Sequence, residues 1–119
     1  MITVTKRFTF EAAHRLAAYK GPCAKMHGHS YKLYITVSGP TQVHADMVID
    51  FKDLKTIVDK YIIDKLDHNM LNEIIPMKTT AENMVIWIGD MIEKHLPVGI
   101  ILQRIRLYET EDSYAEWSL

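Results

Sequence analysis

The feature that most limits the possible folds is a strict alternation of apolar and polar residues in two segments near the start of the chain. Between residues 2 and 12, polar residues occupy one face, and the other face is apolar except for Lys6, with Ile2, Val4, Phe8, Phe10 and Ala12. Residues 31–38 repeat the pattern, with Tyr31, Leu33, Ile35 and Val37 on one face. A period of two is typical of strands that bury one face. The sequence therefore predicts two half-buried strands.

Two later segments carry apolar residues three and four positions apart, which is the spacing of one helical face. Asp50 can cap a helix over about residues 51–65. Thr79 or Thr80 can cap a second helix, which carries the same spacing as far as His95 and which Pro97 ends. Both segments are therefore predicted to be helices with one buried side.

Two more strands complete the predicted order. One runs through Ile101, Ile105 and Leu107, and a short one closes the chain at residues 114–117. The order β-β-α-α-β-β predicts an α+β fold, in which two helices cover one face of a four-stranded antiparallel sheet. Since nothing in the sequence protects the outer strand edges, we also expect the chain to associate with copies of itself.

Length and composition restrict the class of protein. We expect residues 1–119 to form one domain, because 119 residues are too few for a second fold. Fourteen Lys and Arg balance fifteen Asp and Glu without a basic stripe, which argues against nucleic acid as a partner. The sequence has no apolar signal segment and no run long enough to cross a bilayer, so we expect a cytoplasmic protein that has no membrane partner.

Three histidines are the candidate metal ligands. His27 and His29 open the second strand two positions apart, so their imidazoles share its inward face. His14 has the parity of the inward residues of the first strand, and the three rings can meet where the strands pair. Three neutral histidines are a recognised zinc set that leaves a fourth position open for water or substrate. The pattern therefore predicts a catalytic Zn²⁺ site.

Cys23 is the only cysteine, so the chain cannot form an internal disulfide. It lies four positions before His27 in a Gly-Pro loop. The thiol can complete a closed site as a fourth metal ligand, or it can remain free as a reactive base with a lowered pKa. A third interpretation, a small buried apolar residue, fits the loop context less well.

Two further groups are candidates for proton transfer or binding. Asp67 precedes His68 directly after the first predicted helix, and a carboxylate can orient a neighbouring imidazole, although adjacent residues need not touch. Glu109 shares the parity of Ile101, Ile105 and Leu107, so its carboxylate is expected on an apolar face. A carboxylate there needs hydrogen-bond donors. The donors can be two N–H groups of a bound amidine-like edge, or a Lys or Arg in an internal ion pair.

Six segments together resemble one enzyme family: residues 10–16, the Cys-x3-His-Gly-His motif with its flanks at 23–31, and residues 48–55, 66–69, 79–83 and 108–110. The sequence resembles the 6-pyruvoyl-tetrahydropterin and 6-carboxytetrahydropterin synthases over nearly its whole length, in the same motif order. The resemblance implies the tunnelling fold, in which subunits form a ring around a central β-barrel, usually as two stacked trimers.

The same resemblance implies roles for individual residues. His14, His27 and His29 would bind zinc, and Cys23 would be the proton-abstracting base. Asp67 and His68 would form a second proton relay. Glu109 would anchor the pterin ring, and Thr80 and Glu82 would line the substrate pocket. The implied substrate is 7,8-dihydroneopterin triphosphate.

The branch of the family is less sharply indicated. The short spacing between Cys23 and His27 resembles the bacterial 6-carboxy branch, which releases acetaldehyde and triphosphate on the way to the deazapurine of queuosine. Residues 79–83 and 96–110 resemble the 6-pyruvoyl branch of tetrahydrobiopterin synthesis as closely. A third, side-chain-cleaving branch typically has glutamate where this chain has Cys23. A non-catalytic alternative is a zinc-stabilised oligomerisation module, which chelation would unfold.

Overall fold

The two alternating segments form the longest strands of the protein. The computed structural model describes residues 1–16, 25–43 and 45–119. Strand β1 (Thr3–His14) and strand β2 (His27–Ser38) are antiparallel, and they pair without a break from Thr3 opposite Ser38 to His14 opposite His27. Phe8 and Phe10 on β1 are buried, as the alternation predicts.

The first predicted helix is one helical course with a change of pitch inside it. Helix α1 (Phe51–Val58) continues through a π-helical segment, η2 (Asp59–Ile63), into α2 (Asp64–Leu66). The Asp50 carboxylate caps α1 by accepting a 2.8 Å hydrogen bond from the backbone N–H of Lys52. The predicted cap is therefore confirmed, whereas the apolar spacing gave no sign of the π-helical turn.

The second predicted helix is α3 (Ala81–Glu93), and its cap is Thr80. The hydroxyl of Thr80 accepts a 3.2 Å hydrogen bond from the backbone N–H of Asn83. The helix ends at Glu93, before His95, so its predicted end was wrong. The ring of His95 instead stacks on Tyr61 of η2, with centroids 3.5 Å apart.

The sheet has five strands rather than the four predicted. Strand β3 (Asn69–Met70) is followed by the 3₁₀ turn η3 (Leu71–Glu73), and β4 (Ile101–Thr110) and β5 (Ser113–Ser118) end the chain. The order across the sheet is β3-β1-β2-β4-β5, and β3 is parallel to β1. A strand of two residues is too short to show a period, so the sequence pattern missed it and wrongly predicted an entirely antiparallel sheet.

A β-bulge in β4 corrects the predicted parity of that strand. Arg104 pairs with Thr36 but Leu102 pairs with Val37, so Gln103 is an extra residue on β4. The extra residue reverses which side chains face inward. Leu102 is therefore buried, at 3% exposure, and Ile101 is 51% exposed, contrary to the prediction that Ile101 faces the core.

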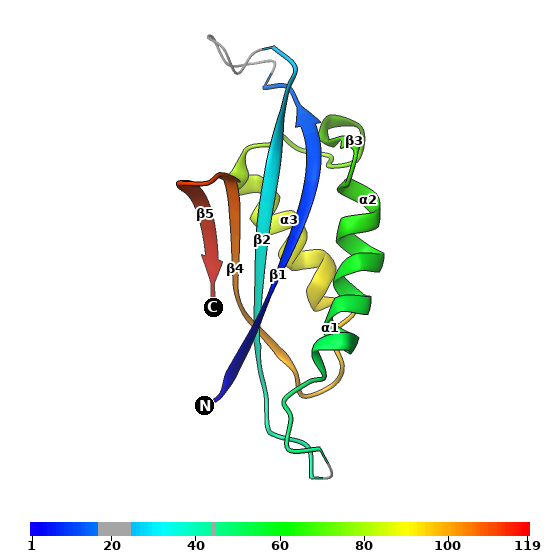
Figure 1. Cartoon of the computed structure of the whole chain (residues 1–119), viewed down its shortest axis with the longest axis vertical. Coiled ribbons are helices and arrows are strands. Elements are labelled where there is room, and N and C mark those ends of the chain that lie inside the picture. The colour runs from blue at the N-terminus through cyan, green and yellow to red at the C-terminus, as the bar shows by residue number, and fades with distance from the viewer. Residues whose placement is uncertain (17–24, 44) are drawn as a thin grey trace.

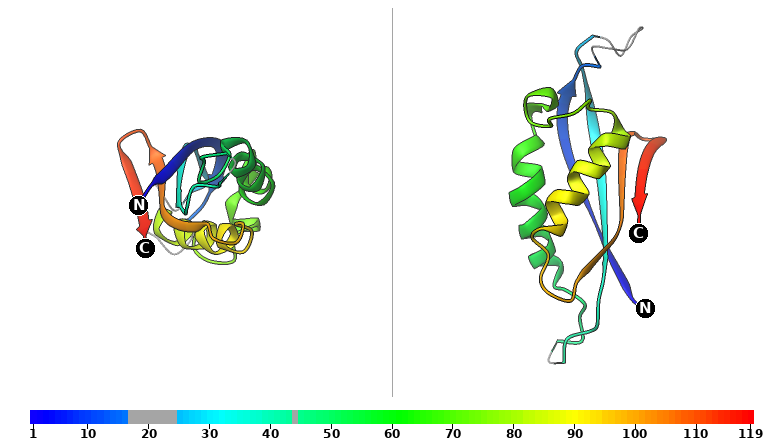
Figure 2. Two further views of the ribbon diagram at one scale, coloured as in Figure 1. Left: turned by 90° about the horizontal axis from the view of Figure 1, so that it is seen from below. Right: turned by 180° about the vertical axis from the view of Figure 1, so that it is seen from behind.

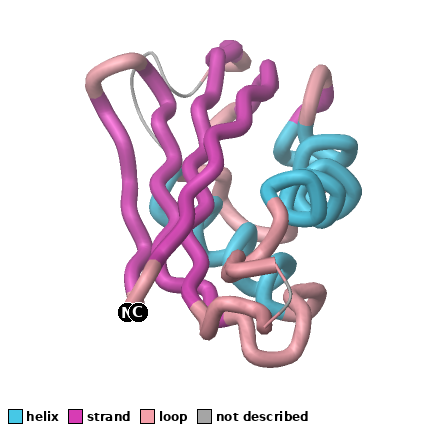
Figure 3. Tube along the Cα trace, turned by 60° about the horizontal axis from the view of Figure 1, so that its bottom comes forward, coloured by secondary structure: helices cyan, strands magenta, loops and turns pink. Residues whose placement is uncertain are grey.

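All the helices lie on one face of the twisted sheet (Figure 1), which confirms the predicted α+β fold. The views from below and from behind in Figure 2 show α3 and the α1–α2 course side by side over the same face. Figure 3 shows the same two layers, with strands on one side and helices on the other. Within the described residues, no helix is both long and apolar enough to span a bilayer. The three histidines lie where β1 ends and β2 begins.

Candidate metal centre and adjoining pockets

The pairing of β1 with β2 brings three imidazoles together. His14 is directly opposite His27, and His29 is opposite Ala12, the inward residue next to His14 on β1. The ring centroids are 4.6 Å apart for His14 and His27, 5.2 Å for His14 and His29, and 4.8 Å for His27 and His29. His14 is fully buried, and the other two are partly buried. Strand register alone therefore builds a cluster of nitrogen donors.

Backbone carbonyl groups orient two of the three rings. The Nδ1 atom of His14 lies 2.8 Å from the carbonyl oxygen of Thr79, just before α3, and 3.1 Å from the hydroxyl of the same residue. The Nδ1 atom of His27 lies 2.8 Å from the carbonyl oxygen of Lys25. A carbonyl oxygen can only accept, so Nδ1 carries the hydrogen in both rings. In the neutral rings Nε2 therefore carries the lone pair.

These two lone pairs point at each other. The Nε2 atoms of His14 and His27 are 3.1 Å apart. Two such nitrogens repel unless a proton or a metal ion lies between them. The Nε2 atom of His29 is buried and makes no hydrogen bond within the described part of the chain. Burial lowers the pKa of His29, which favours the neutral, metal-binding form. The donor set therefore fits a metal ion.

Glu109 completes the cluster from β4. Its Oε1 atom is 3.3 Å from Nε2 of His14 and 3.1 Å from Nε2 of His29. The contact with His14 is the main reason why the pKa of Glu109 is lowered, and it becomes a hydrogen bond only when Nε2 of His14 also carries a hydrogen. The Glu109 carboxylate thus meets histidines, and among the described residues it makes no ion pair with Lys or Arg. One donor atom from each of these four residues lies within 4.8 Å of the others, so the cluster could hold a metal ion.

A second β-bulge sets the direction of the Glu109 side chain. Tyr108 pairs with Tyr114 and Thr110 pairs with Ser113, so Glu109 is the extra residue opposite β5. Bulges re-aim a side chain and are frequent beside active sites. Here the bulge coincides with the one acidic residue of β4, and it lets the carboxylate reach both the histidines and an adjoining pocket.

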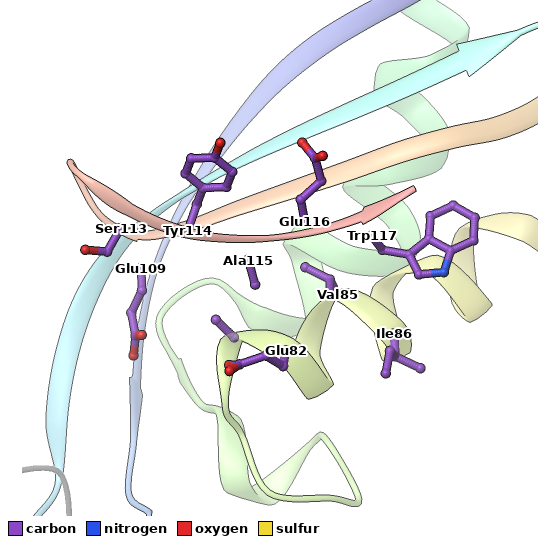
Figure 4. A pocket seen from close by; sticks show the side chains of 10 residues that line it. Glu82, Val85, Ile86, Glu109, Ser113, Tyr114, Ala115, Glu116 and Trp117 are labelled. Carbon is purple, nitrogen blue, oxygen red and sulfur yellow. The ribbon is translucent and has the colours of Figure 1, made fainter. Parts of the chain in front are cut away.

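The adjoining pocket lies between the start of α3 and strand β5 and has a volume of about 500 Å³. Figure 4 shows Glu82 reaching into it from α3 and Glu109 from β4, and the ring of Trp117 also lines it. Thr80 is not among the lining residues, because it is the cap of α3. Two of the three residues suggested for substrate binding therefore share one pocket.

Asp67 and His68 lie beside a different pocket. Nδ1 of His68 is 3.0 Å from Oδ1 of Asp67, so these adjacent residues do touch. Oδ1 of Asp67 also accepts a 2.9 Å hydrogen bond from the backbone N–H of Glu11, which is the main reason why its pKa is lowered. His68 and His29 line this second pocket, of about 550 Å³. The metal cluster thus has one pocket beside Glu109 and another beside His29.

The predicted base, Cys23, lies outside the described residues.

Two groups of the site were not predicted from the sequence. Thr79 appeared only as a possible helix cap, and no sequence signal could reveal that its carbonyl orients His14. Tyr31 appeared only as a buried strand residue, but its ring contacts His29 edge-on at 5.5 Å and its hydroxyl has no partner in the described chain. The parity that it shares with His29 was the available signal.

Comparisons with known proteins identify the family of the chain. The family model for 6-pyruvoyl tetrahydropterin synthase matches residues 3–118. A 6-carboxy-5,6,7,8-tetrahydropterin synthase of Haemophilus influenzae is 33% identical, with 98% of this chain and 99% of that protein covered. The 6-pyruvoyl tetrahydrobiopterin synthase of Homo sapiens is also 33% identical, over 92% of this chain and 86% of its own.

A solved structure agrees with the fold. The Caenorhabditis elegans 6-pyruvoyl tetrahydropterin synthase superimposes with a TM-score of 0.87 at 24% identity, with 99% of this chain and 95% of that chain covered. The match to the family model extends over nearly all of the five-stranded sheet and both long helical courses. The chain therefore belongs to the 6-pyruvoyl tetrahydropterin synthase family.

Proposed function

We propose that this protein is a zinc-dependent lyase acting on 7,8-dihydroneopterin triphosphate. One water molecule would be consumed, and the proposed products are 6-carboxy-5,6,7,8-tetrahydropterin, acetaldehyde and triphosphate. The observation that carries the proposal is the pair of facing Nε2 atoms on His14 and His27, 3.1 Å apart, beside a third imidazole whose Nε2 atom is buried. A cation between these nitrogens would remove the repulsion of their lone pairs, and the pockets beside them leave room for a substrate.

His14, His27 and His29 would hold the zinc ion. Zn–N bonds of about 2.0–2.1 Å in a tetrahedral site separate two ligand nitrogens by about 3.3 Å, close to the spacing of the facing pair. Bound there, zinc supplies positive charge that stabilises negative charge developing on substrate oxygens. The Thr79 and Lys25 carbonyls would keep two rings in the tautomer that exposes Nε2, as outer partners of metal-binding histidines generally do.

The remaining residues would bind the substrate and move its protons. Glu109, with Glu82 across the same pocket, would accept two N–H groups from the amidine-like edge of the pterin. His68, oriented through Nδ1 by Asp67, would exchange a proton at its free Nε2 with the substrate side chain. Cys23 would take a proton through its thiolate sulfur. Triphosphate would leave as charge moves toward the departing oxygen.

The second candidate is 6-pyruvoyl-tetrahydropterin synthase activity. The observation in its favour is that the human and the bacterial relative are equally similar to this chain, at 33% identity each. The short spacing from Cys23 to His27 is our reason for preferring the 6-carboxy reaction. In either case we propose that residues 1–119 act as one domain in a homohexamer built as a dimer of trimers.

Incubation of the zinc-loaded protein with 7,8-dihydroneopterin triphosphate tests the proposal. Mass spectrometry would identify the pterin product, and a parallel assay would measure acetaldehyde. We expect 6-carboxytetrahydropterin together with acetaldehyde. The 6-pyruvoyl product without acetaldehyde would establish the second candidate instead.

Chelation provides the control against the non-catalytic alternative. We expect removal of zinc to abolish turnover while the fold persists, because only two of the five strands carry the metal ligands. Absence of turnover combined with unfolding by the chelator would favour a structural zinc module.

A further inference from the structure

The hydroxyl group of Tyr31 has no assigned role. The side chain is only 1% exposed, and its hydroxyl makes no hydrogen bond in the described part of the chain. Buried polar groups are almost always paired, so an unpaired one needs a physical explanation. One explanation is that its partner moves into place in another state of the protein.

The ring of Tyr31 is packed against the metal cluster. It stacks on Phe10 with centroids 4.8 Å apart and planes within 11°. It also meets His29 and His14 edge-on, at 5.5 and 6.4 Å. These three contacts come from β1 and β2, the strands that also carry the histidine ligands. The direction of the hydroxyl is therefore fixed by the same packing that holds the metal site.

The Glu109 carboxylate is an acceptor that lies near Tyr31 in the strand register. Strand β2 pairs with β4 so that Leu33 is opposite Leu107 and Lys32 is opposite Tyr108. The next positions along the two strands are Tyr31 and Glu109, so the two side chains are neighbours on the inward face. A phenol hydroxyl can donate to a carboxylate oxygen.

Glu109 has two possible positions near these groups. With Oε1 between His14 and His29, it can be a fourth protein ligand and close the metal site. Turned toward the pocket that it shares with Glu82, it leaves the fourth position open. Structural zinc sites are closed, whereas catalytic ones keep an open position. A hydrogen-bond donor that holds the Glu109 carboxylate away from the metal would therefore keep the fourth coordination position open.

We propose that the Tyr31 hydroxyl is this donor: in the metal-loaded protein it binds the Glu109 carboxylate and keeps it from ligating the metal. Tyr31 is thus a positioning residue that acts through Glu109. The inference rests on the proposed function in one respect only, namely that zinc occupies the three-histidine site. It assigns a cause for the open coordination position that a lyase of this kind requires.

The test uses Tyr31→Phe, which keeps the stacked ring and removes only the hydroxyl. Tyr34→Phe is the matched control, since Tyr34 lies on the opposite face of β2, where its ring meets Tyr108. Zinc affinity is measured by competition with a chromogenic chelator. The open position is probed by the visible spectrum of the Co²⁺-substituted protein with and without thiocyanate, while near-ultraviolet charge-transfer absorption reports separately on a thiolate ligand.

We expect thiocyanate to change the Co²⁺ spectrum of the wild-type and Tyr34→Phe proteins. In Tyr31→Phe the freed carboxylate should ligate the metal, which raises zinc affinity by about 10-fold and removes the response to thiocyanate. Adding Glu109→Gln to Tyr31→Phe should restore the response. Thermal melting of the metal-free Tyr31→Phe protein should match wild type or exceed it, because the lost hydroxyl was unpaired.

Wild-type behaviour of Tyr31→Phe in both assays, or a loss of its zinc affinity, would overturn the inference and leave the proposed function in place. The inference also fails if the wild-type metal does not respond to thiocyanate, and turnover of the pterin substrate by the same sample then decides separately whether the proposed function stands. Failure of the wild-type protein to bind zinc would instead overturn both.

Discussion

His68 adopts a backbone conformation that most side chains avoid. Its φ angle is +59°, in the left-handed region, where a Cβ atom meets the following carbonyl oxygen. Hydrogen bonds to Glu11 hold the segment there, since the backbone N–H of His68 donates to the Glu11 carbonyl and the Glu11 N–H donates to Asp67. Strained residues of this kind concentrate at functional sites. The strain places the imidazole beside the second pocket.

Replacing His68 should therefore separate stability from activity. His68→Gly and His68→Ala both remove the imidazole, but only alanine retains the Cβ atom that causes the strain. We expect His68→Gly to be more stable than His68→Ala by about 1 kcal/mol in chemical denaturation. Both should lose most turnover of the pterin substrate. Greater stability of the alanine variant would show that the conformation is not strained, and full turnover by either would remove His68 from the mechanism.

At the scale of the secondary-structure elements, the start of α3 connects helix capping to the metal cluster. Thr80 caps the helix through its hydroxyl, and the preceding Thr79 orients His14 through its carbonyl and hydroxyl. The two threonines are adjacent, so fraying of the first turn of α3 would displace the partner of His14. Helix stability and metal binding are therefore coupled through one short segment.

Thr80→Ala tests this coupling. Loss of the cap should lower the free energy of unfolding by about 1 kcal/mol, and it should weaken zinc binding, because Thr79 is no longer held in place. Thr80→Ser retains a capping hydroxyl and should restore both properties. If Thr80 instead contacts the substrate through its methyl group, Thr80→Ser would raise KM while leaving stability and zinc affinity unchanged.

The pattern of elements could be predicted wherever a period continued over several residues. Alternation placed His14, His27 and His29 on one inward face because β1 and β2 pair without a bulge. The predicted parity of Glu109 with Ile105 and Leu107 was also correct. Ile101 does not share it, because the bulge at Gln103 lies between them. The bulge depends on contacts with a neighbouring strand, so the sequence pattern did not predict it.

Features that depend on distant contacts left no local signal. Strand β3 is two residues long and pairs with β1, which lies more than fifty residues earlier in the chain. The orientation of His14 depends on a carbonyl group at Thr79, and every residue carries such a group. No residue type could therefore mark either feature.

The whole molecule is elongated, with extents of 53 × 23 × 23 Å. Within the described residues both edges of its sheet are open, and strand β5 has a partner only on its β4 side. At the other edge, β3 pairs with β1 only at Ala12 and Ala13. Open edges present unpaired N–H and C=O groups that favour pairing with another chain. The shape of one chain therefore supports the predicted self-association.

Light scattering should give a mass six times that of the 13.8 kDa chain. Hydrogen exchange on the same sample should show that amides of β5 facing away from β4 are protected, although they have no acceptor within the described chain. Amides of β4 that bond to β2 provide the internal reference. A monomeric species with rapid exchange along β5 would contradict the prediction.

The facing nitrogens of His14 and His27 also determine how the site would take up an ion. With both Nδ1 atoms committed to carbonyls, the two Nε2 atoms are left 3.1 Å apart on strands whose pairing already fixes their positions. Loading would then fill a site that already has its shape, and it would proceed without any need to refold the chain.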